Sequence, residues 1–164
     1  MINKIVNRMI EFNSPDARRI NHALKVYAFA HNMAVTEGIQ DTFVLDASAV
    51  LHDIGITVCE KKYNSSAGIY QELEGAKVAR MLLSDLDIDE DKFERILFYI
   101  GNHHTYSASK NIDFQILIEA DLIVNAYEDK LDKYKIREIR DKTFKTDAGR
   151  KMINTVFGLL PEDR

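Results

Sequence analysis

The sequence predicts an all-α protein that folds as a single domain. Two prolines and seven glycines in 164 residues leave long stretches without a helix breaker, and Ala, Leu, Ile, Lys and Glu favour helices. No segment alternates apolar and polar residues between turn residues, as a strand would. The length suits one domain, and no linker or internal repeat divides residues 1–164.

Start and stop signals divide the chain into helices. Ser14-Pro15-Asp16 marks a helix start, because the hydroxyl can cap and the proline fills a position that needs no N–H. Asp41 or Thr42 is expected to cap a later helix, and Gly55 to end it in a left-handed conformation. Helices are expected over residues 2–12, 16–37, 42–54, 70–83, 89–103, 114–127 and from 147 to before Pro161, with loops at 56–68 and 105–111 and solvated helix and turn at 128–141.

Composition narrows the choice of partners and location. The net charge is −4, and no basic block is interleaved with aromatic residues, so neither a nucleic-acid polymer nor an anionic membrane is an expected partner. The one cysteine, Cys59, cannot form an internal disulfide and is expected to be a buried side chain. No stretch resembles a signal peptide or a membrane span. These features predict a soluble protein of the cytoplasm.

An adjacent histidine and aspartate close an apolar helical segment, ASAVLHDIG, at His52 and Asp53. An imidazole and a carboxylate at the inner end of a buried helix each need a hydrogen-bond partner, an ion pair or a metal. A salt bridge without chemistry would satisfy the dipeptide if it stood alone. The rest of the chain decides between these alternatives.

Other ionisable residues also lie on apolar helical backgrounds: His22, the pair His103-His104, and Asp121 within FQILIEADLIVNAY. A carboxylate in so apolar a helix is costly unless it is neutralised. Taken singly, each residue is more often a satisfied polar group. Together, imidazoles and carboxylates suggest convergence on Zn, Mn, Fe, Co or Ni, and the absence of cysteine favours an open catalytic site over a structural zinc site.

The order of these residues resembles the HD superfamily of metal-dependent phosphohydrolases. The segments HALKV, AVLHDIG, EGAKVARMLL, NHH and EADLIVNAYE follow the family order from about residue 19 to 128. The resemblance implies a bundle of about five core helices with peripheral helices, and a C-terminal helical extension over residues 129–164. It also implies one divalent metal (Mn, Fe, Ni, Co, Zn or Mg), with a second ion left open, held by His22, His52, Asp53 and Asp121.

Departures from the family pattern narrow this interpretation. Dinuclear relatives carry a histidine four residues before the Gly-Ala of the fourth helix, where this chain has Gln71. Cyclic-dinucleotide phosphodiesterases carry HDIGK and a GYP segment, whereas this chain has HDIGI and no GYP. Alarmone hydrolases follow the HD pair with a Glu-Asp pair, and here Ile56-Thr57-Val58 stands in that region. Both activities are therefore disfavoured.

The implied reaction is attack on phosphorus by a metal-activated water. Asp53 is expected to serve catalysis as well as metal binding. His104 is the first candidate donor to the developing phosphoryl charge, and Glu72 a candidate acid–base group, with Glu74 as the other. For both glutamates an exposed structural carboxylate is the alternative.

Further residues are candidates for substrate binding. His103 could meet the substrate phosphate or hold a second metal, and Lys62, with its neighbours Lys61 and Tyr63, lies in a loop that could cover the site. Lys145-Thr146 could bind phosphate at the N-terminus of the last helix. Ordinary solvated charge is the alternative for each lysine. Glu119 is expected to face away and be structural.

The predicted function is hydrolysis of a small phosphorylated metabolite, with a nucleotide favoured as substrate and a homodimer as a possible assembly. One alternative is a non-catalytic module of the same fold that binds a nucleotide or a partner. Another is a helical structural protein with buried ion pairs. Metal content of the purified protein and a phosphatase screen would separate these alternatives.

Overall fold

The computed structural model describes residues 1–108 and 111–159, and over these residues the chain forms helices and no strand. The prediction of an all-α fold is therefore confirmed. Residues 109–110 of the expected 105–111 loop, and Pro161 after the last helix, lie outside the described residues. The helices are α1 (Ile2–Asn13), α2 (Ala17–Thr36), α3 (Phe43–Leu51), α4 (Ile56–Tyr63), α5 (Gly68–Leu83), α6 (Glu90–Ile100), α7 (Ile112–Glu128), α8 (Lys133–Thr143) and α9 (Asp147–Phe157).

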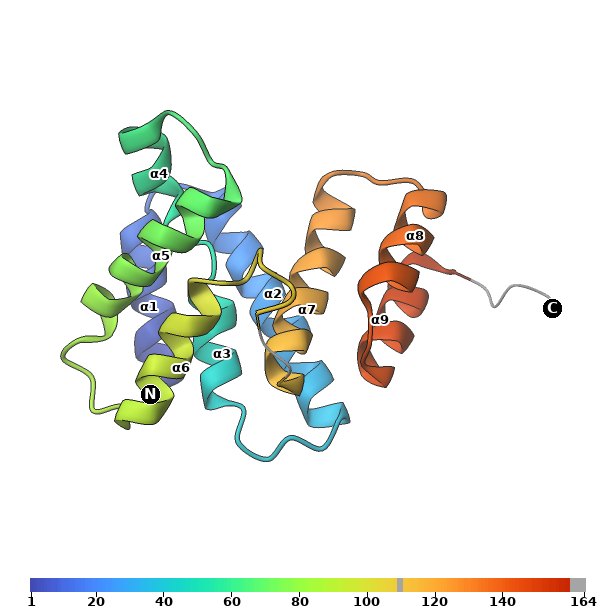
Figure 1. The fold of residues 1–164 in the computed structure, drawn as a ribbon, viewed down its shortest axis with the longest axis horizontal. Coiled ribbons are helices and arrows are strands. Elements are labelled where there is room, and N and C mark those ends of the chain that lie inside the picture. The colour runs from blue at the N-terminus through green and yellow to red at the C-terminus, as the bar shows by residue number, and fades with distance from the viewer. Residues whose placement is uncertain (109–110, 160–164) are drawn as a thin grey trace.

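The central helix of the bundle is α3. Its residues from Val44 to Leu51 are all buried, as expected of a helix that is surrounded on every side. The long helices α2 and α7 pack against each other and against α3, while α1 and α6 cover other sides of α3 and α5 packs on α6 (Figure 1). The hairpin of α8 and α9 lies at one end of the molecule, where α9 packs on α2 and α7 (Figure 1).

Several helix starts have side-chain caps, although not at the residues that the sequence suggested: Asp16 rather than Ser14 caps α2, and Thr42 makes no side-chain cap hydrogen bond at α3. The side chains of Asp16, Asp89, Asp132 and Thr146 each accept a hydrogen bond from the backbone N–H three residues further on. Such caps satisfy one of the backbone donors that a helix start leaves free. The starts expected at residues 16, 89 and 147 lie within one position of those of α2, α6 and α9, whereas no start was predicted for α8.

The expected loop over residues 56–68 is wrong in its first half, where the chain forms α4. The turn residues of this segment begin only at Asn64, which ends the helix in a left-handed conformation with φ of 49°. Tertiary contacts hold α4 in place: Cys59 is buried, as predicted, and the buried carboxylate of Glu74 on α5 accepts hydrogen bonds from Lys62 Nζ at 2.9 Å and Tyr63 Oη at 2.7 Å. Helix formation here depends on packing rather than on local propensity.

Gly55 serves a different purpose from the one predicted. It has right-handed backbone angles, φ −78° and ψ −18°, so the expected left-handed helix stop is wrong. A Cβ at this position would lie 2.5 Å from the backbone nitrogen of Gly75 and 2.9 Å from the carbonyl oxygen of Gln71. The turn between α3 and α4 therefore needs glycine because it touches the backbone of α5.

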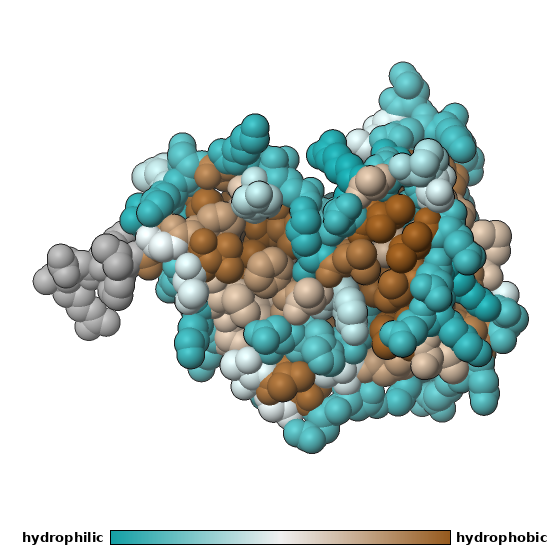
Figure 2. All heavy atoms as spheres, turned by 180° about the vertical axis from the view of Figure 1, so that it is seen from behind, coloured by the Kyte–Doolittle hydropathy of each residue, from teal (hydrophilic) through white to brown (hydrophobic). Residues whose placement is uncertain are grey.

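The surface is mixed rather than uniformly polar. Figure 2, the view from behind, shows hydrophobic side chains gathered in patches between hydrophilic ones. Among the residues that the structure describes, no helix has both the length and the apolar character that crossing a bilayer requires. The predicted homodimer stays a prediction.

Candidate metal centre

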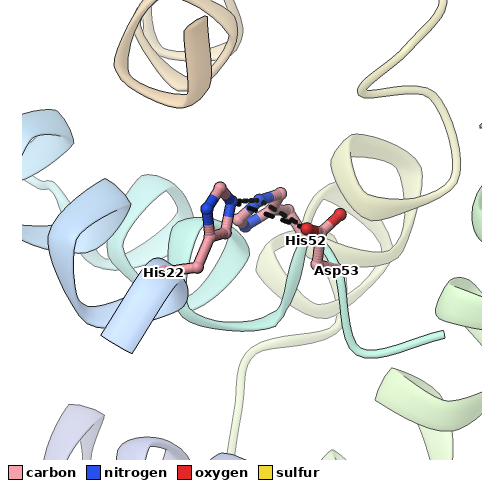
Figure 3. Close-up of side chains that lie close together, drawn as sticks. All are labelled: His22, His52 and Asp53. Carbon is pink, nitrogen blue, oxygen red and sulfur yellow. Dashed lines mark hydrogen bonds and ion pairs between the residues drawn. The ribbon is translucent and has the colours of Figure 1, made fainter. Parts of the chain in front are cut away.

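Three helices bring the four expected ligands together in the middle of the bundle. His22 projects from α2, His52 and Asp53 lie where α3 ends (Figure 3), and Asp121 projects from α7. The Nε2 atoms of His22 and His52 face each other at 3.2 Å. Asp121 Oδ1 lies 3.2 Å from the first and 3.4 Å from the second, and Asp53 Oδ2 lies 3.5 Å from both.

These separations fit a common metal ion. Nitrogen and oxygen ligands about 2.0–2.1 Å from a tetrahedral ion lie about 3.3–3.4 Å from one another. The five separations that involve an imidazole run from 3.2 to 3.5 Å. The ligand atoms of His22, His52 and Asp53 lie close enough together to hold one divalent cation, and Asp121 Oδ1 lies beside the two imidazoles.

The hydrogen bonds on the far side of each imidazole set its tautomer. His22 Nδ1 lies 3.1 Å from the carboxylate of Glu128, and His52 Nδ1 lies 2.8 Å from the carbonyl oxygen of Ala49. Both partners are acceptors, so both Nδ1 atoms must donate. The Nε2 atom of each neutral ring is then unprotonated and faces the cluster, as metal ligation requires.

The charges of the cluster show why it needs a cation. Burial disfavours the charged form of His52, yet the carboxylates of Asp53 and Asp121 outweigh burial and raise the pKa of His52 to about 9. Burial likewise opposes ionisation of Asp53, but the neighbouring His52 and His103 lower the pKa of Asp53 to about 2. Without a metal, protons on the imidazoles balance the two carboxylates. Metal binding would replace those protons.

A second group lies next to the first and shares Asp53 with it. Ligand atoms of Asp53, His103 and His104 lie within 4.8 Å of one another. His103 donates Nδ1–H to the carbonyl oxygen of Ile100, while its buried Nε2 has no hydrogen-bond partner and lies 3.4 Å from Asp53 Oδ1. A buried ring nitrogen that faces a carboxylate oxygen is a place where a proton or a metal ion would be stabilised.

The first group opens onto a cavity of about 300 Å³, at the lower end of the volumes of small-molecule sites. Its lining includes His22, Asp53 and Asp121, with His104 and Gln71 on another side. A reactant in this cavity would therefore lie beside the cluster of possible metal ligands.

A family model for the HD domain matches residues 19–145. The chain belongs to the HD domain family. The match begins at the expected boundary and continues past residue 128, so it includes α8, which was assigned to the extension. No curated protein and no solved structure matches the chain.

Within this HD domain, Gln71 stands at the position where a further ligand would complete the second group. Gln71 Nε2 donates to the carbonyl oxygen of Ser66 at 2.6 Å, which leaves Gln71 Oε1 to accept from His104 Nε2 at 3.1 Å. The Nε2 proton of His104 is thereby committed to an amide rather than free for a metal. The glutamine therefore supports one fully ligated ion rather than two.

Replacing Gln71 with histidine is expected to raise the metal-to-protein ratio under saturating Mn²⁺ from about one towards two. The substitution supplies an imidazole and frees His104 Nε2 from its amide partner. Elemental analysis of the two proteins after gel filtration measures the ratio, with Gln71→Ala as a control that frees His104 without adding a ligand. An unchanged ratio in Gln71→His would show that the second group is incomplete for another reason.

The structure places Lys62 and Glu72 away from the cavity. Lys62 is paired with the buried carboxylate of Glu74, and Lys62 does not line the cavity. Glu72 accepts from the backbone N–H of His104 and from Thr105 Oγ1, both at 3.0 Å. These contacts give Glu72 and Glu74 structural partners. The acid–base role expected of the glutamates and the substrate contact expected of Lys62 stay predictions without geometric support.

The expected phosphate site at Lys145-Thr146 is also separate from the cluster. Thr146 is buried, and its backbone N–H and that of Lys145 both donate to Glu119 Oε1, at 3.1 and 2.6 Å. The carboxylate of Glu37 accepts from the backbone N–H of Ala148 at 2.6 Å. The N-terminus of α9 thus already holds two carboxylates of the chain itself, so the expectation of phosphate at Lys145-Thr146 stays a prediction without geometric support. The structural role predicted for Glu119 is confirmed.

Glu128 is the residue of the centre that sequence reasoning missed. It lies seven residues after Asp121, two turns further along the same face of α7, and that spacing was the available signal. Its carboxylate contacts His22 Nδ1 at 3.1 Å and Lys25 Nζ at 2.8 Å. A carboxylate behind a ligating histidine fixes the ring and strengthens it as a ligand.

Replacement of Glu128 by alanine is expected to weaken Mn²⁺ binding by about 10–100-fold, the usual cost of losing such a partner. Glu128→Gln keeps an acceptor for His22 Nδ1 but loses the charge, so its Mn²⁺ affinity should lie between those of the wild type and Glu128→Ala. Equilibrium titration of metal-free protein with Mn²⁺ measures both affinities. Equal affinities in the wild type and Glu128→Ala would show that His22 is oriented without Glu128.

Proposed function

We propose that the protein is a metal-dependent phosphohydrolase that acts on a small phosphorylated metabolite. The observation that carries this proposal is the pair of Nε2 atoms, on His22 and His52, that converges with Asp53 and Asp121 beside a cavity of about 300 Å³. Ligands at these positions leave room for a reactant, unlike a closed structural site. A cytoplasmic location stays a prediction of the sequence.

A divalent metal held by these four residues would polarise a phosphoryl oxygen and supply a water with a lowered pKa. The chain's own residues would do the rest. Asp53 directs Oδ2 towards His22 and His52 and Oδ1 towards His103, so it orders both groups at once. His104 lines the cavity, and burial lowers the pKa of its imidazole. A neutral His104 has a single N–H, so it would have to release Gln71 Oε1 before it could donate to a phosphoryl oxygen.

The cavity supports a substrate about the size of one mononucleotide or smaller. Nucleotides are accordingly the first class to be screened, followed by sugar phosphates, with each of Mn²⁺, Fe²⁺, Co²⁺, Ni²⁺, Zn²⁺ and Mg²⁺. Phosphate release with any metal supports the hydrolase. Binding of the same compounds without release with every metal would favour the non-catalytic binding module.

Loss of His104 and loss of Asp121 are expected to differ in kind. His104→Ala should keep its metal and lose about 10²–10³-fold in kcat/KM, the order of effect of removing one charge-stabilising donor. Asp121→Ala should lose the metal, because a charged ligand is gone, and added metal should restore activity only in part. Metal content and melting temperature of both variants separate the two roles.

Metal loss from His104→Ala as complete as that from Asp121→Ala would make His104 a ligand. The second group would then be occupied in the wild type, and the centre would hold two ions. Full metal content in Asp121→Ala would instead contradict the ligand assignment on α7.

A further inference from the structure

Arg18 is a positively charged residue at the cavity that takes no part in the metal centre. Arg18, in the first turn of α2, lines the same cavity as His22 and Asp121. It is exposed, and within residues 1–108 and 111–159 no hydrogen bond or ion pair engages its guanidinium. Arginine is the side chain best suited to bind phosphate or carboxylate through paired hydrogen bonds.

The helix itself places Arg18 relative to the metal centre. Residues four apart lie on the same face of an α-helix, one above the other, and each residue adds about 1.5 Å along the axis. Arg18 and His22 are four apart on α2. The backbone position of Arg18 therefore lies about 6 Å along the helix from that of the expected ligand His22, and its guanidinium extends from there.

The neighbouring arginine cannot take the same role, because its partners are already fixed. Arg19 contacts Glu60 Oε1 at 2.6 Å, Thr57 Oγ1 at 3.0 Å and Asp16 Oδ2 at 3.2 Å. Arg19 thus bridges α2 to α4. Its single positive charge balances only one of the two negative charges, of Asp16 and Glu60, at this end of the cavity. Without Arg18 the entrance would carry a negative charge that opposes an anionic substrate.

We propose that Arg18 forms a second anion subsite and that the substrate carries a further anionic group, phosphate or carboxylate, about 6 Å or more from the scissile phosphate. The inference rests on the proposed function for the position of the scissile phosphate. It assigns Arg18 to substrate selection rather than to the chemical step. A substrate with two anionic groups would span the cavity from the metal centre to the first turn of α2.

Two matched pairs of probes test the subsite. Glycerol 3-phosphate and 3-phosphoglycerate differ by a carboxylate, and fructose 6-phosphate and fructose 1,6-bisphosphate differ by a phosphate. Equilibrium titration of the Mn²⁺-loaded protein measures the dissociation constants, and released inorganic phosphate records hydrolysis in the same samples. The variants are Arg18→Ala, Arg18→Lys and, as a control, Arg150→Ala, which removes an exposed cation on α9 that does not line the cavity.

The wild type is expected to bind the doubly anionic member of at least one pair about 10-fold more tightly, a typical effect of one charge-assisted contact. The pair that shows the preference identifies the group as carboxylate or phosphate. Arg18→Ala should reduce the preference to less than about threefold while binding of the singly anionic member stays within about twofold. Arg18→Lys should lie between, and Arg150→Ala should match the wild type.

A wild type without preference in either pair would overturn the inference. So would an unchanged preference in Arg18→Ala, or an equal loss for both members of a pair in a variant with normal melting temperature. A preference that depends on Arg18, together with no phosphate release with any metal in the wider screen, would support the subsite and contradict the proposed hydrolase, so the two failures are distinguishable.

Discussion

Replacement of Asp53 by alanine is expected to abolish metal binding. The wild type, purified after growth with Mn, Fe, Ni and Zn, should contain bound metal, and the variant should contain less than a tenth of it. Asp53 supplies one carboxylate oxygen to each of two groups, at 3.5 Å from His22 and His52 and 3.4 Å from His103. Its loss removes a negative charge from among the imidazoles and leaves a cation undercompensated. Elemental analysis measures the result.

Asp46→Ala is the matched control for this experiment. Asp46 is also a buried carboxylate, in the first turn of α3. It is also paired with a histidine, because Asp46 Oδ1 lies 3.1 Å from His31 Nδ1. It lies outside the cluster, so its loss should lower stability and leave the metal content unchanged. Full metal content in Asp53→Ala, or no metal in the wild type under any growth condition, would contradict the metal centre itself.

Replacement of Gly55 by alanine is expected to lower the free energy of unfolding by about 3 kcal/mol, at the upper end of the cost of overpacking. The added Cβ would meet backbone atoms of Gly75 and Gln71 at 2.5 to 2.9 Å, and backbone cannot rotate away as a side chain can. For a chain of this length the melting temperature should fall by about 6–12 °C. Thermal unfolding followed by circular dichroism measures the shift.

Gly75→Ala probes the same contact from the other side. Its Cβ would meet the Ile100 Cγ2 atom at 3.1 Å, a side-chain atom that can move, and alanine favours a helix by up to about 1 kcal/mol over glycine. The variant should melt within about 3 °C of the wild type. A Gly55→Ala protein as stable as Gly75→Ala would show that the two segments can separate without cost.

The elements that the sequence predicted well are those with local signals. Capping residues such as Asp16 and Thr146 mark helix starts through hydrogen bonds to backbone only three residues away. The ligands His22, His52, Asp53 and Asp121 were recognisable because ionisable residues on apolar helices need compensation, and their order resembled a known family. The structure places these four together, while their role as ligands stays a prediction.

The features that the sequence did not predict depend on distant contacts. Helix α4 is held by Glu74, which lies 11 or 12 residues from its partners Tyr63 and Lys62. The N-terminus of α9 resembled an open anion site, but Glu119, 27 residues before Thr146, fills it. A glycine likewise has the same local signature whether it turns the chain or touches another backbone, as at Gly55.

The position of α8 has a consequence for how the molecule opens. This helix buries only Ile136 and packs chiefly on α9, so its amides should exchange with solvent through local unfolding that leaves the bundle intact. The helices that supply His22, Asp53 and Asp121 can exchange only when the centre itself comes apart. Bound metal should therefore slow hydrogen exchange in α2, α3 and α7 and leave exchange in α8 unchanged, since a ligand stabilises only against openings that release it.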